Sequence, residues 1–134
     1  RTHVFIDEIH VIFENEESAT FFASAWRQFH KRDAYPTGIT QNVKYLLSSQ
    51  QGTCTLSNSE FIVMLNQSAN DREDLARLLN ISEEQMGYIT NAPTGSGLIK
   101  YGGSIVPFVN KMPKGLLYDL NTTKPEDRIT TKTH

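Results

Sequence analysis

Short apolar runs alternate with helical segments along most of this chain, and that alternation limits the fold more than any other feature. Three β-prone runs, at 4–6, 37–40 and 61–65, are each followed by residues with helical spacing. Strands joined through helices are usually parallel and connected by right-handed crossovers. The sequence therefore predicts an α/β protein.

The helical segments are recognised by their apolar spacing and their end residues. The first begins at Ser18, carries Phe22, Trp26 and Phe29 at helical intervals, and is closed by Pro36. A brief helix through 43–47 follows the second strand, and two later helices open at 70–73 and 82–85, which both have the form of a capping box. The runs at 4–6 and 61–65 are uninterrupted, which predicts strands buried on both faces.

The last third of the chain has a different character, with glycines that bracket short β-prone runs at 98–101 and 105–109, followed by 116–120. These runs predict a β-hairpin extension. Because the chain enters a strand almost at its first residue, we expect a fragment that lacks the first strands of its domain. The predicted fold is a truncated RecA-like three-layer sandwich with a mainly parallel sheet over 1–120, followed by a polar tail at 121–134.

Composition limits the classes of function. The 134 residues include 13 Lys and Arg against 15 Asp and Glu, a net charge of -2 that gives no simple reason to propose a nucleic-acid-coating protein. No apolar run approaches the roughly 18 residues that a membrane span needs. Cys54 has no second cysteine to pair with, which mildly favours a reducing compartment.

Two acids, Asp7 and Glu8, end the first apolar run. Open α/β sheets bind ligands at the carboxyl ends of their strands, and nucleotide hydrolases place an acid pair there. In that arrangement Asp7 holds a magnesium ion through a bound water, and Glu8 acts as the base that orients the attacking water. The alternative is that both acids cap the next segment or face solvent.

Gln41 follows the second predicted strand, which would set its amide beside Glu8 if the two strands are neighbours. An amide in that place can sense a terminal phosphate or position the attacking water. His3 and His10 flank the acids, one before the strand and one beyond it, a spacing that does not favour zinc.

Several segments, taken in order, resemble the carboxyl-terminal half of the conjugative type IV secretion ATPases, which are RecA-like P-loop NTPases. The resemblance extends over nearly the whole chain, and the order of the segments is more specific than any one of them. The segments are His3–Ile9, Phe29–Arg32, Pro36–Asn42, Ser57–Gln67, Gly97–Ile99, Ile105–Phe108 and Leu117–Pro125.

This resemblance implies an ATP- and Mg-dependent motor, a homo-hexameric ring at the cytoplasmic face of the cell membrane. Such a motor powers DNA or protein transfer for plasmids and conjugative transposons, with channel and coupling proteins as partners and DNA as a further candidate. By the same resemblance Asp7 and Glu8 form the Walker B pair, and Gln41 is the family's strand-end glutamine. Each site is completed by an arginine from the neighbouring subunit, for which Arg32 is our choice, ahead of Arg27 and Lys31.

The phosphate-binding loop is the main departure from the family pattern. No Gly-x-x-x-x-Gly-Lys-Ser/Thr occurs in the sequence, and in the family this loop lies well upstream of the acid pair. We therefore expect the full-length parent to hydrolyse ATP and the fragment alone to be inactive.

Two other classes of function stay open. Asp7–His10 also matches the Asp-Glu-x-His box of nucleic-acid helicases, and Ser18–Thr20 mimics their next motif, but that motif should lie on a strand and here opens a helix. The third class is a non-catalytic assembly module of the secretion machinery, which would pack against its partners through the hairpin and the tail.

Overall fold

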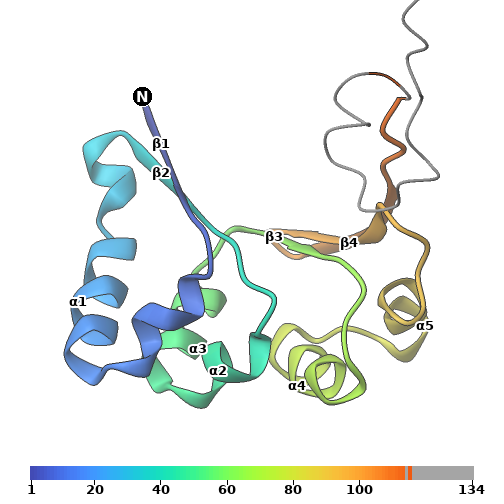
Figure 1. The fold of residues 1–134 in the computed structure, drawn as a ribbon, viewed down its shortest axis with the longest axis horizontal. Coiled ribbons are helices and arrows are strands. Elements are labelled where there is room, and N and C mark those ends of the chain that lie inside the picture. Colours follow the sequence, from blue (N-terminus) through green and yellow to red (C-terminus); the bar gives the residue numbers. More distant parts are fainter. Residues whose placement is uncertain (114, 116–134) are drawn as a thin grey trace, which may run out of the picture.

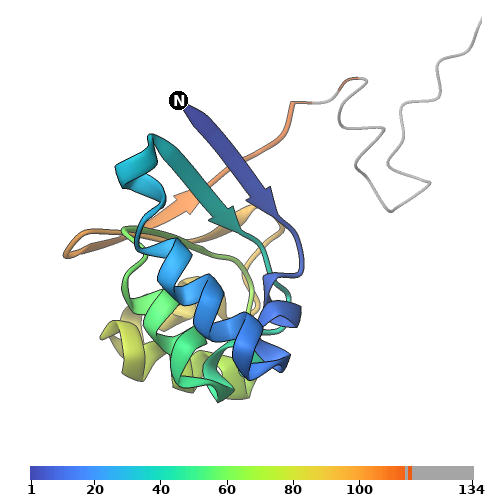
Figure 2. The ribbon, with the colours of Figure 1, turned by 90° about the vertical axis from the view of Figure 1, so that its left-hand side faces the viewer.

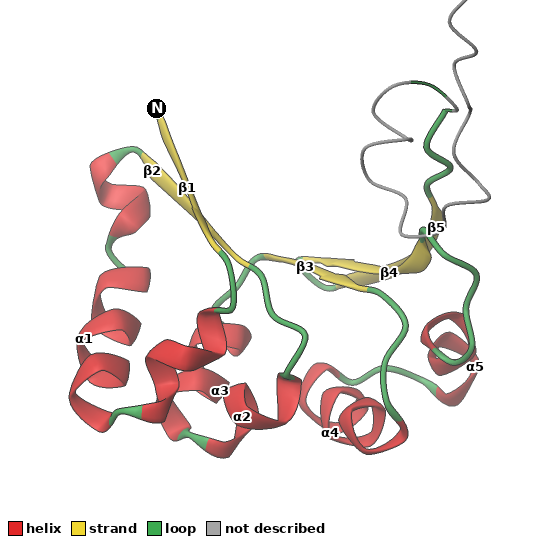
Figure 3. Ribbon diagram, in the orientation of Figure 1, coloured by secondary structure: helices red, strands yellow, loops and turns green. Residues whose placement is uncertain are grey.

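A computed structural model describes residues 1–113 and 115 of the chain (Figure 1). Its strands form two sheets, which Figure 3 shows in yellow. In the first sheet β1 (Thr2–Ile6) pairs in parallel with β2 (Ala34–Gly38). In the second, β3 (Phe61–Met64), β4 (Ser96–Tyr101) and β5 (Ser104–Val109) are antiparallel in that order. The chain is thus α/β with one parallel and one antiparallel sheet.

The helices lie on one side of the strands, as Figures 1 and 2 show from two directions. None of the described helices is long and apolar enough to cross a membrane. The α-helices are α1 (Glu16–Trp26), α2 (Val43–Ser48), α3 (Gln50–Ser57), α4 (Ala69–Leu79) and α5 (Glu83–Met86), and the short 3-10 helices are η1 (Ile9–Glu14), η2 (Phe29–Arg32) and η3 (Gly87–Ile89).

Each strand is covered on at most one face, and the prediction that the first and third are buried on both faces is wrong for the described residues. Ile62 and Met64 of β3 are buried, whereas the alternate side chains Phe61 and Val63 are exposed. In β1 the side chains of Val4 and Ile6 are partly covered, and Phe5 is 70% exposed. The reason is that the described helices cover a single side of the sheets, so alternate side chains of each strand have no packing partner.

The predicted mainly parallel sheet also differs from the described pairings, because β3 joins an antiparallel sheet. The cause lies in the connection from β3 to β4. The Gln67 amide donates to the Ile89 carbonyl at 3.0 Å, and the Ala92 amide donates to Asn66 Oδ1 at 3.3 Å. These bonds hold the chain just before β4 close to the carboxyl end of β3. β4 therefore starts at that end and runs antiparallel to β3.

Two elements have boundaries that differ from those predicted. The second strand was predicted at 37–40 but lies at Ala34–Gly38, with Pro36 inside it opposite Val4. Proline is tolerated in a strand where its missing N–H is not needed for pairing. The first helix ends at Trp26, so Phe29 lies in η2 rather than in the same helix. Its start is set by Asn15, whose side chain accepts from the Ser18 amide at 3.0 Å.

The hairpin predicted after the glycines is present as β4 and β5. The further run at 116–120 and the tail at 121–134 lie outside the described residues, and the division at residue 120 stays a prediction.

The buried residues form two clusters. One lies beneath the antiparallel sheet, where Ile62 and Leu98 pack with Leu75 of α4 and Ile89 of η3. The other lies beside the parallel pair and anchors η1 against α1 and α2; its members are Ile9, Phe13, Ala19, Phe22 and Leu46. The residues that directly follow the acid pair are therefore held in a packed core.

The expected capping boxes differ in outcome. Ser82 caps α5 as predicted: its Oγ accepts from the Gln85 amide at 3.2 Å, and Gln85 Oε1 accepts from the Ser82 amide at 3.0 Å. The box predicted at 70–73 is wrong, because α4 begins slightly earlier, with Ser68 rather than Asn70 as its cap. Ser68 is followed by Asp71 in the same spacing, which is the pattern that the prediction overlooked.

Replacing Ser82 by Ala should lower the free energy of unfolding by about 1 kcal/mol, because an amide at the start of α5 loses its acceptor. Urea unfolding of the 134-residue chain measures this change. The matched control is Ser57→Ala, since Ser57 is exposed at the end of α3 and caps no helix start. Equal effects of the two substitutions would contradict the capping role.

Candidate functional site

The carboxyl ends of β1 and β2 meet, as the sequence predicted for its first two strands. Ile6 lies opposite Gly38 in the parallel register. Beyond these residues the Ile39 amide donates to the Ile6 carbonyl, and the Ile9 amide donates to the Ile39 carbonyl, each at 2.9 Å. The segments that follow the two strands are therefore bonded to each other, and Asp7 and Glu8 lie between the bonded residues.

The backbone at the acid pair is sharply turned. Glu8 has a φ of 48° and a ψ of 45°, the left-handed region that glutamate rarely adopts. Among the described residues, the other non-glycine residues with positive φ are aspartates or asparagines, which tolerate it better: Asp33, Asn80 and Asn91. The Glu8 amide donates to Asp7 Oδ1 at 2.9 Å. A conformation that costs energy and yet persists is typical of functional sites.

Glu8 has a partner that the sequence analysis did not identify. Its Oε2 atom is shielded from solvent and lies 3.3 Å from His10 Nδ1, within ion-pair distance but without the geometry of a hydrogen bond. His10 Nδ1 shares a 3.0 Å hydrogen bond with Thr40 Oγ1, which in turn accepts from the Asn42 amide at 3.0 Å. Glu8, which follows β1, is thus connected to the segment after β2.

The sequence suggested His10 as a metal ligand or as the histidine of a helicase box, and it did not indicate Thr40 as a site residue. The available signal was weak: Thr40 directly precedes the candidate glutamine, and His10 follows Glu8 by two positions. Neither spacing indicates a contact without the parallel pairing that brings the two segments together.

Gln41 lies beyond the end of β2, between Thr40 and Asn42, and it is exposed. Its side chain forms no hydrogen bond with the described residues. The two strand ends are adjacent, so the geometry that the glutamine hypothesis needs is available, while the approach of the Gln41 amide to Glu8 stays a prediction.

Arg32 lies at the other end of the parallel pair. It ends η2 just before β2 and is exposed, as are Arg27 and Lys31. At about 3.3 Å per residue, the length of β1 places this end roughly 15 Å from the acid pair. Arg32 also borders a shallow cavity of about 240 Å³ with Phe21 and Phe29. This position is far from Asp7 and Glu8 of the same chain.

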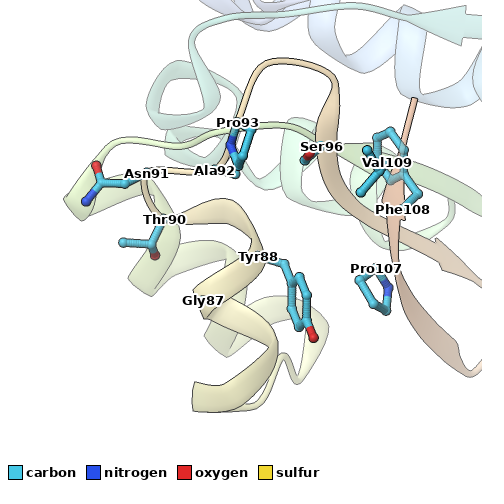
Figure 4. Close-up of a pocket in the computed structure, with 10 residues that line it drawn as sticks. All are labelled: Gly87, Tyr88, Thr90, Asn91, Ala92, Pro93, Ser96, Pro107, Phe108 and Val109. Atoms are coloured by element: carbon cyan, nitrogen blue, oxygen red, sulfur yellow. The ribbon is translucent and has the colours of Figure 1, made fainter. Parts of the chain in front are cut away.

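A second cavity is unrelated to the acid pair. It measures about 450 Å³ and lies between η3 and β5, where Tyr88, Pro93, Pro107 and Phe108 line it (Figure 4). None of the predicted site residues contributes to it, and Tyr88 is its one titratable side chain. An apolar cavity without acids or bases offers no hydrolytic chemistry, so the strand ends are the better candidate site.

Metal-binding capacity rests on Asp7. No group of three His, Cys, Asp or Glu side chains within the described ranges could hold a metal ion. Magnesium, however, usually keeps several waters and uses one or two protein carboxylates together with substrate phosphates. Asp7 is exposed at the strand end, and this donor set suits such a water-mediated site.

The helicase hypothesis loses support from the position of its second motif. Ser18–Thr20 lie inside α1, with Ala19 buried against η1 and α2, rather than on a strand. A helical tripeptide cannot take the role of a strand-borne motif.

Comparison with known proteins identifies the fold. No family model matches the chain, and no curated protein matches it either. Among solved structures the chain is similar to VirB4 of Thermoanaerobacter pseudethanolicus, with a TM-score of 0.78 and 24% sequence identity over 84% of this chain. The similarity spans 32% of the length of that protein. The chain therefore has the fold of a part of VirB4, which agrees with the resemblance found in the sequence.

Proposed function

We propose that this chain is the part of a type IV secretion ATPase that holds the water-activating acid, a truncated RecA-like three-layer domain. The observation that carries the proposal is the bonded pair of strand ends, where the Ile9 amide donates to the Ile39 carbonyl at 2.9 Å beside Asp7 and Glu8. The similarity in fold to VirB4 supports it independently.

In this proposal each polar residue at the strand ends has one role. Asp7 binds the waters of a magnesium ion, which when bound neutralises charge on the nucleotide phosphates. Glu8 orients the attacking water and accepts its proton. Gln41 contacts the terminal phosphate or the same water. The nucleotide phosphates would be held by a loop that this sequence does not contain.

The direct test is a longer version of the protein, extended upstream to include a Gly-x-x-x-x-Gly-Lys-Ser/Thr loop. We expect magnesium-dependent ATP hydrolysis from that protein and none from the 134-residue chain. An extended protein with an intact loop and no ATP hydrolysis would contradict the proposal.

We further propose that Arg32 acts on the neighbouring subunit of a homo-hexameric ring. Its distance from Asp7 and Glu8 of its own chain excludes a contact within one subunit. The exposed Phe21 and partly buried Phe29 beside it are the kind of aromatic side chains that are enriched in subunit interfaces.

A mixing experiment measures this role. Arg32→Ala and Glu8→Gln each inactivate the ring if both residues are needed, but a mixed ring contains sites with an intact Glu8 and an intact Arg32 from its neighbour. At equal mixing we expect recovery of about a quarter of the sites, since each of two adjacent positions must be filled correctly. Recovered ATPase activity is the readout.

The matched control is Arg77→Ala, which should leave the ATPase rate within about a factor of two because Arg77 is exposed in the last turn of α4 and belongs to no proposed site. If the mixture of Arg32→Ala and Glu8→Gln stays as inactive as its components, the arginine does not act across the interface.

The wider setting follows from the same family. The parent protein would work at the cytoplasmic face of the membrane, with channel and coupling proteins as partners and DNA or protein as cargo, for a plasmid or conjugative transposon. Residues 1–120 would belong to the ATPase domain and 121–134 would follow it as a polar tail.

A second candidate function is an assembly module, favoured by the apolar side chains that the sheets expose, among them Phe5, Phe61 and Tyr101. Binding of this chain to a purified channel or coupling protein of the same transfer system would support it, provided that Asp7→Ala with Glu8→Ala leaves the affinity unchanged.

A further inference from the structure

We propose that His10 is a positioning residue for Glu8: it holds the Glu8 carboxylate in place and connects it to the segment after β2 through the Thr40 hydroxyl. This inference rests on the proposed function, in which Glu8 orients the attacking water.

One oxygen of the Glu8 carboxylate, Oε2, faces His10. Glu8 Oε2 is shielded from solvent and 3.3 Å from His10 Nδ1, although the Glu8 side chain as a whole is 45% exposed. The solvent exposure of the Glu8 side chain therefore comes from atoms other than Oε2. A shielded oxygen without a hydrogen bond costs stability unless a polar group faces it, and the imidazole supplies that group. The rest of the carboxylate stays open to a water molecule.

The imidazole itself is fixed from two sides. Its side chain is 15% exposed, its ring lies against Tyr45 with 6.1 Å between centroids, and Nδ1 bonds to Thr40 Oγ1 at 3.0 Å. Thr40 is held in turn by the Asn42 amide. A rigid imidazole restricts the flexible glutamate side chain, and small displacements of a reacting group can cost about 10²-fold in rate.

The contacts involve Nδ1 rather than Nε2, and this choice provides a sharp experiment. Asparagine places a polar atom near the position of Nδ1, whereas glutamine reaches the more distant position of Nε2. In the extended ATPase we expect His10→Ala and His10→Gln to lower kcat by about 10–100-fold, a range typical for residues that orient a functional group. KM for ATP should stay within about a factor of two, and His10→Asn should recover most of the lost rate.

The background of Glu8→Gln shows whether His10 acts through Glu8. In a protein that already carries Glu8→Gln, adding His10→Ala should cause no further loss of rate, since the carboxylate that His10 orients is already absent. Full additivity, equal effects of the Asn and Gln variants, or a rise in KM that makes the loss in kcat/KM much larger than the loss in kcat would each overturn the inference.

A readout without catalysis separates this inference from the proposed function. In the 134-residue chain, NMR signals of the His10 ring should shift on Glu8→Gln and on Thr40→Val but not on Glu14→Gln, an exposed glutamate at the end of η1. Unmoved ring signals on Glu8→Gln would overturn the inference even if the extended protein hydrolyses ATP. If Glu8→Gln leaves ATP hydrolysis intact, the proposed function fails, and the positioning role for hydrolysis fails with it.

Discussion

Glu8→Gln in the extended ATPase should lower kcat for ATP hydrolysis by about 10²–10⁴-fold, the typical contribution of a positioned general base. Glutamine has nearly the same shape and keeps one carbonyl oxygen, but it cannot accept the proton of the attacking water. Binding of ATP should persist, because Glu8 is assigned to the water and not to the phosphates. Steady-state kinetics and equilibrium nucleotide binding measure the two quantities.

The matched control is Glu14→Gln, the same chemical change at an exposed residue at the end of η1. Its effect on kcat should lie within about twofold, since an exposed surface charge outside the strand ends contributes little. Unchanged hydrolysis in the Glu8→Gln variant would contradict the assignment of Glu8 as the general base. Loss of ATP binding together with hydrolysis would instead place Glu8 in phosphate binding.

Leu98→Ala should reduce the free energy of unfolding by about 2–5 kcal/mol, the range for large-to-small changes in protein cores. Leu98 of β4 is fully buried, with 0% exposure, in the cluster that contains Ile62, Leu75 and Ile89. Removal of its side chain leaves a cavity beneath the antiparallel sheet, because its neighbours belong to several different helices and strands and cannot all close on it. Urea denaturation with a constant m-value measures the loss.

Leu65→Ala is the matched control, because Leu65 carries the same side chain directly after β3 and is 51% exposed. We expect a change of at most about 1 kcal/mol there, since much of its surface already contacts water. A similar loss at both positions would show that the antiparallel sheet is not the packed core of this chain.

Local patterns predicted most elements of the fold. The apolar run that ends in Asp7 and Glu8 is β1, the glycine-bracketed runs form the β4–β5 hairpin, and Ser82 caps α5 through the box read from the sequence. Resemblance of ordered segments to type IV secretion ATPases is confirmed at the level of fold by the similarity to VirB4. These features depend on residues close in sequence, or on several motifs that follow one another in a fixed order along the chain.

Burial and strand direction were predicted less well. An uninterrupted apolar run such as 61–65 looks the same whether one or both faces are covered, and only the placement of the helices on one side of the sheets exposes Phe61 and Val63. Direction of β4 depends on hydrogen bonds such as that from Gln67 to Ile89, between residues far apart in the chain.

For the candidate site, the sequence by itself determined which acids end a strand and which glutamine follows the next one. The tertiary structure alone decided that these strand ends are bonded neighbours, that Arg32 lies at the far end, and that Glu8 faces His10 and through it Thr40. The physical reason is that side-chain type and spacing act over a few residues, whereas the partner of a carboxylate depends on which distant segments pack together.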